Sequence, residues 1–148
     1  GYALVVMTIP LVSGPLLAAV GDDRSAATLA QVIRNTPAPG TRVLGISAYP
    51  PSLPFYLRET VDVATATGRE LTSNFIADYV DRFRALPGSP LKPGDYWRDV
   101  LAHCPQPTVF ITRTGDAATR GVLDRALPLL AVQGRYAAYG PCAASSAR

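Results

Sequence analysis

An uncharged apolar stretch opens the chain and ends abruptly in charge. Residues 1–21 read GYALVVMTIPLVSGPLLAAVG, and the next three residues are all charged. About 20 apolar residues, at 1.5 Å per residue in a helix, are enough to cross a hydrocarbon core of about 30 Å. The prolines and glycines of this stretch are tolerated better in a membrane helix than in a soluble one. We therefore expect residues 1–21 to form a transmembrane helix that ends a longer membrane region.

Two other interpretations of residues 1–21 remain open. The stretch could form a kinked core element of a soluble domain, or it could be a secretory signal sequence. A signal sequence needs a basic beginning and normally starts with Met, whereas this chain opens with Gly1 and Tyr2. A first residue other than Met also suggests a fragment of a longer protein.

The rest of the chain, residues 22–148, alternates between helical and strand patterns. Apolar positions at helical spacing, bounded by Pro and Gly, predict longer helices over residues 25–35, 70–86, 95–104 and 117–127. Short apolar or β-branched runs predict strands over residues 43–48, 61–65, 108–112 and 135–139. A short helix over residues 53–57 connects the first two strands. This order predicts a three-layer α/β domain around a small, mainly parallel sheet with an antiparallel edge strand.

Composition narrows the classes of function. Hydrophobic residues make up 48% of the chain and charged residues 17%, against about 25% charged in average soluble proteins, so a disordered tail is excluded. The net charge is +3, and the basic residues form no run. We therefore expect a weakly basic surface and no nucleic-acid partner.

The two cysteines flank two of the predicted strands. Cys104 precedes the strand over residues 108–112, and Cys142 follows the strand over residues 135–139. If these strands pair antiparallel, the two cysteines approach one another. A disulfide between them would stabilise the fold by about 4 kcal/mol in the chain-entropy model and would require an oxidising compartment. Two unrelated buried thiols are the alternative.

The usual catalytic and metal motifs are absent from the sequence. There is no HExxH, paired CxxC, P-loop or GxGxxG, so we expect no metal site and no cofactor. The segment Gly45-Ile46-Ser47-Ala48-Tyr49 approaches the nucleophile motif GxSxG, but Tyr49 replaces the last glycine. The only histidine, His103, precedes the strand over residues 108–112, so we expect it at the opposite edge of the sheet from Ser47. We also expect the carboxylates of Asp95 and Asp99 to be solvated.

Polar and aromatic residues follow the first two predicted strands. Ligands of open α/β sheets bind beyond the carboxyl ends of the strands. Rings stack on sugars, and fixed polar groups orient their hydroxyls. We expect substrate contacts at this edge, although loop packing also explains the tyrosines; the candidates are Tyr49, Ser52, Tyr56, Glu70 and Asn74.

A series of loose motifs covers nearly the whole chain, and S-L-P-F-Y-L is the most specific of them. In chain order the motifs are R-S-A-x-x-L-A at Arg24–Ala30, P-G-T-R-V at Pro39–Val43, Tyr49 with S-L-P-F-Y-L at Ser52–Leu57, Glu70-Leu71, W-R-D-V-L from Trp97, and T-V-F-I-T at Thr108–Thr112. This series resembles the C-terminal region of bacterial membrane glycosyltransferases of the aminoarabinose-transferase and protein O-mannosyltransferase type.

The resemblance implies a soluble domain on the extracytoplasmic, periplasmic side of the bacterial inner membrane. Proteins of this type transfer a sugar from a polyprenyl-phosphate carrier to a lipid, glycan or protein. Their catalytic acidic residues sit in an early extracytoplasmic loop that no position of this chain matches, so we assign no catalytic residue. The implied role is accessory, and the implied partners are the membrane, the remainder of the parent protein and a lipid-linked sugar or its acceptor.

Two further hypotheses come from other classes of function. The chain could be a membrane-anchored or secreted binding module that is not catalytic. It could also be a small soluble α/β enzyme or interaction domain whose first segment is core. Membrane partitioning of the intact chain separates this last hypothesis from the others.

Overall fold

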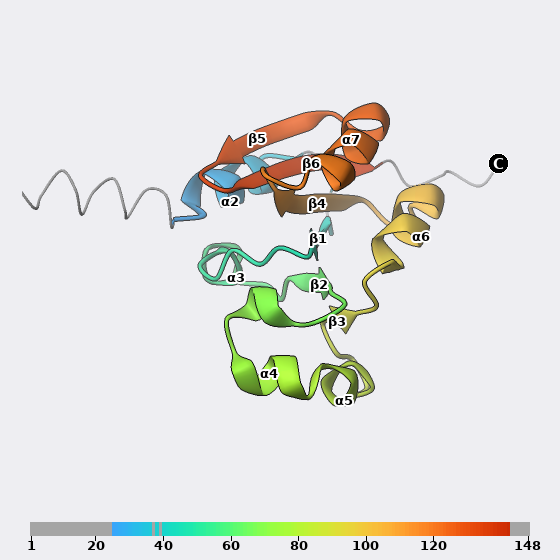
Figure 1. The fold of residues 1–148 in the computed structure, drawn as a ribbon. Coiled ribbons are helices and arrows are strands. Elements are labelled where there is room, and N and C mark those ends of the chain that lie inside the picture. Colours follow the sequence, from blue (N-terminus) through green and yellow to red (C-terminus); the bar gives the residue numbers. More distant parts are fainter. Residues whose placement is uncertain (1–24, 37, 39, 143–148) are drawn as a thin grey trace, which may run out of the picture.

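A six-stranded mixed sheet organises the part of the chain that this computed structural model describes, residues 25–36, 38 and 40–142 (Figure 1). In spatial order the strands are β3 (Leu91–Lys92), β2 (Asp62–Ala64), β1 (Arg42–Ile46), β4 (Thr108–Arg113), β6 (Tyr136–Cys142) and β5 (Leu129–Gln133). The first four are mutually parallel, and β6 runs antiparallel to both of its neighbours. The predicted α/β class with a mostly parallel sheet is confirmed. The antiparallel strand is not at the edge, however, because β5 pairs along its outer side.

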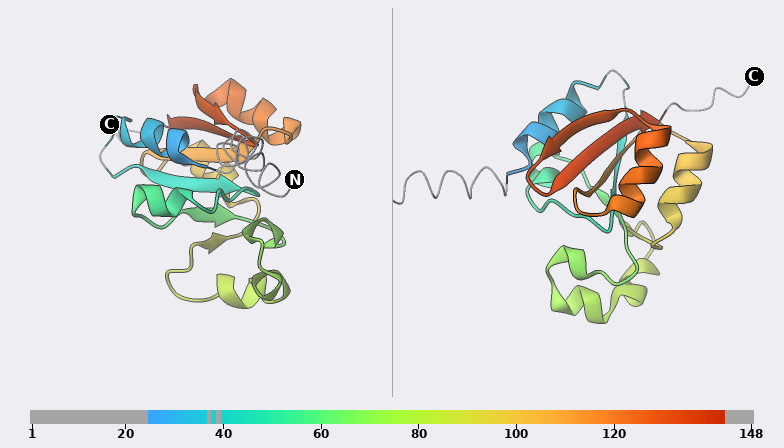
Figure 2. Two further views of the ribbon diagram at one scale, coloured as in Figure 1. Left: turned by 90° about the vertical axis from the view of Figure 1, so that its left-hand side faces the viewer. Right: turned by 45° about the horizontal axis from the view of Figure 1, so that its top comes forward.

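Helices cover both faces of the sheet (Figures 1 and 2). Side chains alternate along the strands, so Val109 and Ile111 of β4 pack with one group of helices, while Phe110 packs with the other. The first group is α2 (Ala27–Arg34) and α3 (Leu53–Leu57), and the second is α6 (Tyr96–His103) and α7 (Ala117–Ala126). This alternation makes β4 a buried central strand.

The predicted helix over residues 70–86 is wrong. The structure divides this segment into the 3-10 helix η1 (Arg69–Leu71), α4 (Asn74–Asp78) and α5 (Val80–Arg84). Thr72 adopts a left-handed conformation with φ 55°, and the Ser73 side chain then caps α4 by accepting a hydrogen bond from the Ile76 amide. Tyr79, with φ −121° and ψ 24°, separates α4 from α5. The helical periodicity is therefore real but interrupted twice.

Two strands lack a predicted counterpart. Strand β3 has two residues, too few for an alternating pattern to appear. Strand β5 follows Pro128, which marks the end of α7, and Gly134 with φ 54° turns the chain from β5 into β6. The predicted strand over residues 135–139 is therefore one arm of a hairpin.

A disulfide between Cys104 and Cys142 joins the end of α6 to the end of β6. Strands β4 and β6 pair antiparallel, and Thr108 lies opposite Cys142. The antiparallel pairing on which the disulfide depends is present, and it brings the two cysteines to a Cα–Cα distance of 6.0 Å. The bridge therefore links α6 to β6 beside the amino end of β4.

The expected transmembrane helix over residues 1–21 lies outside the described residues. Among residues 25–36, 38 and 40–142, no helix has the length and apolar character needed to span a bilayer.

Candidate functional site

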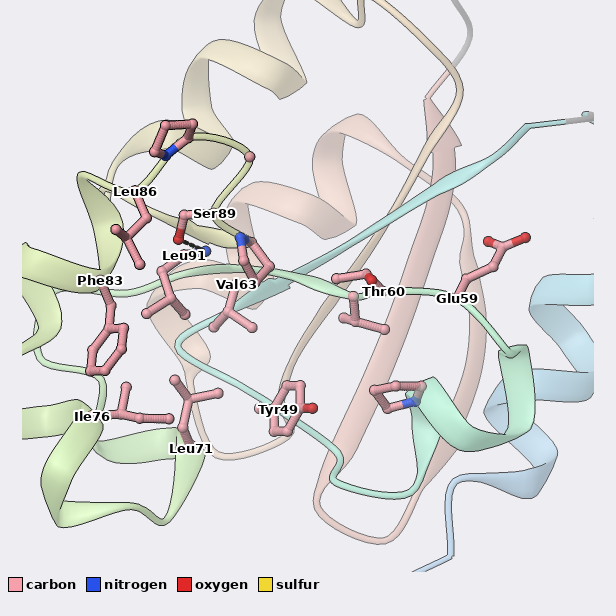
Figure 3. A pocket seen from close by; sticks show the side chains of 15 residues that line it. Tyr49, Glu59, Thr60, Val63, Leu71, Ile76, Phe83, Leu86, Ser89 and Leu91 are labelled. Carbon is pink, nitrogen blue, oxygen red and sulfur yellow. Dashed lines mark hydrogen bonds between the residues drawn. The ribbon is translucent and has the colours of Figure 1, made fainter.

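A cavity of about 600 Å³ opens beside β2 and β3 (Figure 3). It lies between the sheet edge, the loop that follows β1, and helices α4 and α5. Most of its lining is apolar. The residues that line it are Tyr49, Pro54, Glu59, Thr60, Val61, Val63, Leu71, Ile76, Phe83, Leu86, Pro87, Gly88, Ser89, Pro90 and Leu91.

Local structure fixes the two ends of this cavity. The Ser89 hydroxyl accepts a hydrogen bond of 3.1 Å from the Leu91 amide, and the Val63 amide donates to the Pro90 carbonyl at 2.8 Å. These bonds hold the Pro-rich turn against β2. At the other end, the Tyr136 hydroxyl donates to the Tyr49 carbonyl at 3.2 Å. The cavity wall is therefore tied to β2 and β3 at one end and to β6 at the other.

The chemistry of the cavity suits the binding of an apolar group. Its side chains from β2, η1, α4, α5 and β3 turn toward a shared space, whereas the Glu59 carboxylate points away from them (Figure 3). The polar groups at its edge are Glu59, Thr60 and Ser89, with no paired carboxylates and no histidine in the lining. In the described part of the chain, no three His, Cys, Asp or Glu side chains gather as metal ligands would. The ionisable side chains in the lining are Glu59 and Tyr49.

An exposed aromatic cluster adjoins the cavity on α4 and α5. We call Phe75, Tyr79, Phe83 and Leu86 the α4–α5 cluster; Phe83 and Leu86 also line the cavity. The Phe75 ring lies 5.1 Å from the Tyr79 ring and 5.6 Å from the Phe83 ring, between ring centroids. The cluster exists because the interrupted helix cannot bury its whole apolar stripe: Val80 is buried and Phe75 is not. Phe75, Tyr79 and Leu86 of this cluster therefore remain exposed beside the cavity.

The ionisable groups with clearly shifted pKa values lie outside this cavity. Burial disfavours the charge of Arg42, but the Asp62 carboxylate and the Tyr96 hydroxyl outweigh it and raise the Arg42 pKa. Burial raises the pKa of Tyr139, although its hydroxyl accepts a hydrogen bond of 3.1 Å from Arg120 that acts in the opposite direction. Arg42 lies on β1 and Tyr139 on β6, and the Arg120 pKa is also raised, first by its hydrogen bond to Tyr139.

Comparison with known proteins identifies the architecture. No family model and no curated protein matches this sequence. The crystal structure of ArnT from Cupriavidus metallidurans in the apo state matches 83% of this chain, with a TM-score of 0.55 and 22% sequence identity. The structure of the same protein bound to undecaprenyl phosphate matches 84% of the chain, with a TM-score of 0.56 and 23% identity. The chain shares its fold with part of ArnT.

The match to ArnT confirms the predicted resemblance to aminoarabinose transferases at the level of the fold. This chain corresponds to 21% of the length of ArnT. The similarity therefore concerns one part of a much longer protein.

The predicted substrate contacts lie in separate surroundings on the ArnT-like fold. Tyr49 lines the cavity, whereas Tyr56 lines a shallow hollow with Arg34 and Arg58. The Ser52 hydroxyl accepts a hydrogen bond of 3.0 Å from the Ala26 amide, at the beginning of α2. Tyr49 and Ser52 lie in the β1–α3 connection and Tyr56 lies in α3, and the three residues have different surroundings.

The remaining two predicted contacts follow β2. Glu70 of η1 is 8% exposed, and its Oε1 atom is buried without a hydrogen-bond partner. Asn74, the first residue of α4, is exposed. Ile76 and Phe83 fall within the single helix predicted over residues 70–86, and that prediction did not indicate that they line a cavity. The available signal was Ser73, an N-cap residue type inside the predicted helix, whereas the Pro-Gly-Ser-Pro break at residues 87–90 comes after it.

The GxSxG-like segment forms a tight turn after β1. Ser47 has φ 45°, and a Cβ atom on Gly45 would lie 2.1 Å from the Ala48 carbonyl oxygen, so glycine is needed there. His103 ends α6, before β4, and its Nδ1 atom lies 3.0 Å from the Asp99 carbonyl oxygen. Because β1 and β4 are parallel, His103 lies at the amino edge of the sheet and Ser47 at the carboxyl edge. The two side chains therefore cannot form a nucleophile–base pair.

Proposed function

We propose that this chain is an accessory extracytoplasmic domain of a membrane glycosyltransferase that uses a polyprenyl-phosphate-linked sugar. The observation that carries the proposal is the fold shared with ArnT over 83% of the chain. The match to ArnT bound to undecaprenyl phosphate supports a lipid-linked donor. In this proposal, residues 1–21 cross the bacterial inner membrane and residues 22–148 form the external domain.

The disulfide supports the external location. A bond between Cys104 and Cys142 persists in an oxidising compartment and is rare in the cytosol. A periplasmic domain meets this condition.

The proposed role of the domain is to bind substrate rather than to transfer the sugar. The cavity beside β2 and β3 has an apolar wall and offers no acid–base pair. We assign it the apolar portion of a lipid-linked donor or acceptor, with Tyr49 at one side. Ser52, Tyr56, Glu70 and Asn74 stay in the proposal as secondary contacts, and the catalytic residues belong to another part of the protein.

The proposal is tested by filling the cavity in the protein that carries this domain. Ile76→Trp places a bulky indole ring in the cavity wall, and Leu129→Trp places the same ring on the outer strand β5 as a matched control. Sugar transfer from a polyprenyl-phosphate donor should fall about tenfold with Ile76→Trp, as expected for an obstructed apolar pocket, and stay unchanged with Leu129→Trp. Equal transfer by both variants, each with unchanged thermal unfolding, contradicts the substrate-binding role.

A non-catalytic binding module without a transferase parent is the second candidate. The same apolar cavity favours it, since ligand binding needs no catalytic partner. A parent protein without sugar-transfer activity would favour this alternative.

A further inference from the structure

The S-L-P-F-Y-L segment carries the most exposed large hydrophobic side chain of the described residues. Phe55 of α3 is 79% exposed, and its ring lies 5.7 Å from the Tyr56 ring in an edge-on arrangement. Neither the cavity wall nor the sheet explains why a phenylalanine points into solvent here, because the side chain that α3 buries is Leu53. The exposed ring is therefore available to a partner.

Two arginines flank this aromatic pair. Arg34, near the end of α2, donates a hydrogen bond to the Tyr56 carbonyl, and Arg58 follows α3 in a left-handed conformation. Both arginines are exposed. Together with Pro54 and the two aromatic residues, they complete the lining of a shallow hollow that contains no acidic residue. We call Phe55, Tyr56, Arg34 and Arg58 the α3 tip.

The preceding part of the chain joins the domain beside the α3 tip. The Ala26 amide donates to the Ser52 hydroxyl, so the beginning of α2 is tied to the residue just before α3. Figures 1 and 2 show α3 next to the first described turn of α2. A polypeptide that leaves Ser25 therefore starts next to α3. The sequence that precedes this point includes the uncharged stretch over residues 1–21.

We propose that the α3 tip is a membrane-surface anchor that inserts Phe55 and Tyr56 into the interface of an anionic lipid bilayer. Aromatic rings concentrate at the level of the lipid headgroups, and arginines near that level attract anionic phospholipids. A span over residues 1–21 would place the bilayer surface close to Ser25 and hence close to α3. The inference rests on the proposed function for this span and adds the face of the domain that meets the lipid.

The anchor would determine the orientation of the domain. One attachment, through the chain before Ser25, leaves the domain free to rotate over the membrane. A second contact through the α3 tip removes much of that freedom. Because Pro54 lines both the hollow at the α3 tip and the larger cavity, the cavity mouth would then be held close to the lipid surface.

Fluorescence quenching by brominated lipid tests this anchor in the full 148-residue chain. The chain is reconstituted into nanodiscs that contain phosphatidylglycerol, with bromine atoms placed high on the acyl chains. Phe55→Trp reports on the α3 tip. Leu129→Trp is the matched control, because Leu129 is also an exposed apolar residue but begins β5, whereas Gln133 at the other end of β5 contacts α2. The native Trp97 is buried and supplies the background signal.

We expect the emission added by Phe55→Trp to be largely quenched and that added by Leu129→Trp to stay unquenched. Replacing both tip arginines, Arg34→Glu with Arg58→Glu, should weaken the quenching of Phe55→Trp in anionic nanodiscs. Arg125→Glu, on the exposed side of α7, should leave it unchanged.

The outcomes separate this inference from the proposed function. If the chain enters the nanodisc and Phe55→Trp is unquenched, the anchor is wrong while the span and the accessory role stand. If a photocrosslinker at position 55 of the whole parent protein captures protein in place of lipid, the α3 tip packs on the remainder of the parent and the anchor is again wrong. If the chain does not associate with the nanodisc at all, the span over residues 1–21 fails, and both proposals lose their common premise.

Discussion

The two halves of the sheet, divided along the order of its strands, differ in how completely their apolar side chains are packed. On one side, β4, β5, β6, α6 and α7 form what we call the disulfide half, with long paired strands and the Cys104–Cys142 bridge. On the other, β2, β3, η1, α4 and α5 form the cavity half, where β3 has two residues and only Val63, Val80 and Leu91 form a buried cluster. The first half stabilises the fold. The second leaves apolar surface uncovered, which is the property that a binding region needs.

Removing the disulfide should cause the largest loss of unfolding free energy. The bridge closes a separation of 38 residues, for which the chain-entropy model gives about 4 kcal/mol of stability. Cys104→Ser with Cys142→Ser should lower the free energy of unfolding by about this amount. Chemical denaturation followed by the fluorescence of Trp97, a buried residue of α6, measures it. Reduction of the wild-type chain should give the same loss, and an unchanged midpoint in both experiments would contradict the role of the bridge.

A Leu→Ala substitution should lower the free energy of unfolding by different amounts in the two halves. Leu123 of α7 is 0% exposed, whereas Leu86, beside the cavity, is 53% exposed. Leu123→Ala should lower the free energy of unfolding by about 3 kcal/mol, because it removes buried side-chain volume that its neighbours cannot refill. Leu86→Ala should change it by less than about 0.5 kcal/mol. Equal losses would mean that Leu86 contributes to a core and that the cavity half is not an open surface.

Raising the pH should cause the smallest loss of stability, through a tyrosine in the disulfide half. Burial of Tyr139 raises its pKa, so the folded state retains the phenol proton at a pH where the unfolded chain releases it. This contribution is complete below pH of about 10, the ordinary tyrosine pKa, and is lost as the pH rises through the raised value. Tyr139→Phe should therefore flatten the decline of unfolding free energy in alkaline solution. Tyr79→Phe, at an exposed residue, is the control, and identical alkaline profiles for the two variants would refute the assignment.

The disulfide half was predicted better than the cavity half, although its outer strand β5 was missed. The β-branched run of β4 and the amphipathic patterns of α6 and α7 are strong local signals, and the structure places all three elements where these signals predict them. Local pattern agrees with tertiary packing in this half because each apolar face has a partner.

The cavity half was predicted less well for a physical reason. The periodicity over residues 70–86 predicts one helix, but the left-handed Thr72 and the break at Tyr79 depend on tertiary contacts and backbone conformation that periodicity does not encode. The cavity was not predicted for the same reason. Ile76 and Phe83 looked like core residues, and only the three-dimensional arrangement shows that they line a cavity.

The positions of the first and last described residues have a practical consequence. Ser25 leaves the domain beside α3, near the carboxyl end of β1, whereas Cys142 is fixed opposite Thr108 at the amino end of β4. Figure 1 shows the beginning of α2 and the end of β6 on opposite sides of the molecule. A fluorophore or affinity tag attached behind Cys142 would therefore be remote from the α3 tip. The carboxyl-terminal side is therefore the suitable point of attachment for immobilising the protein while the opposite face stays accessible.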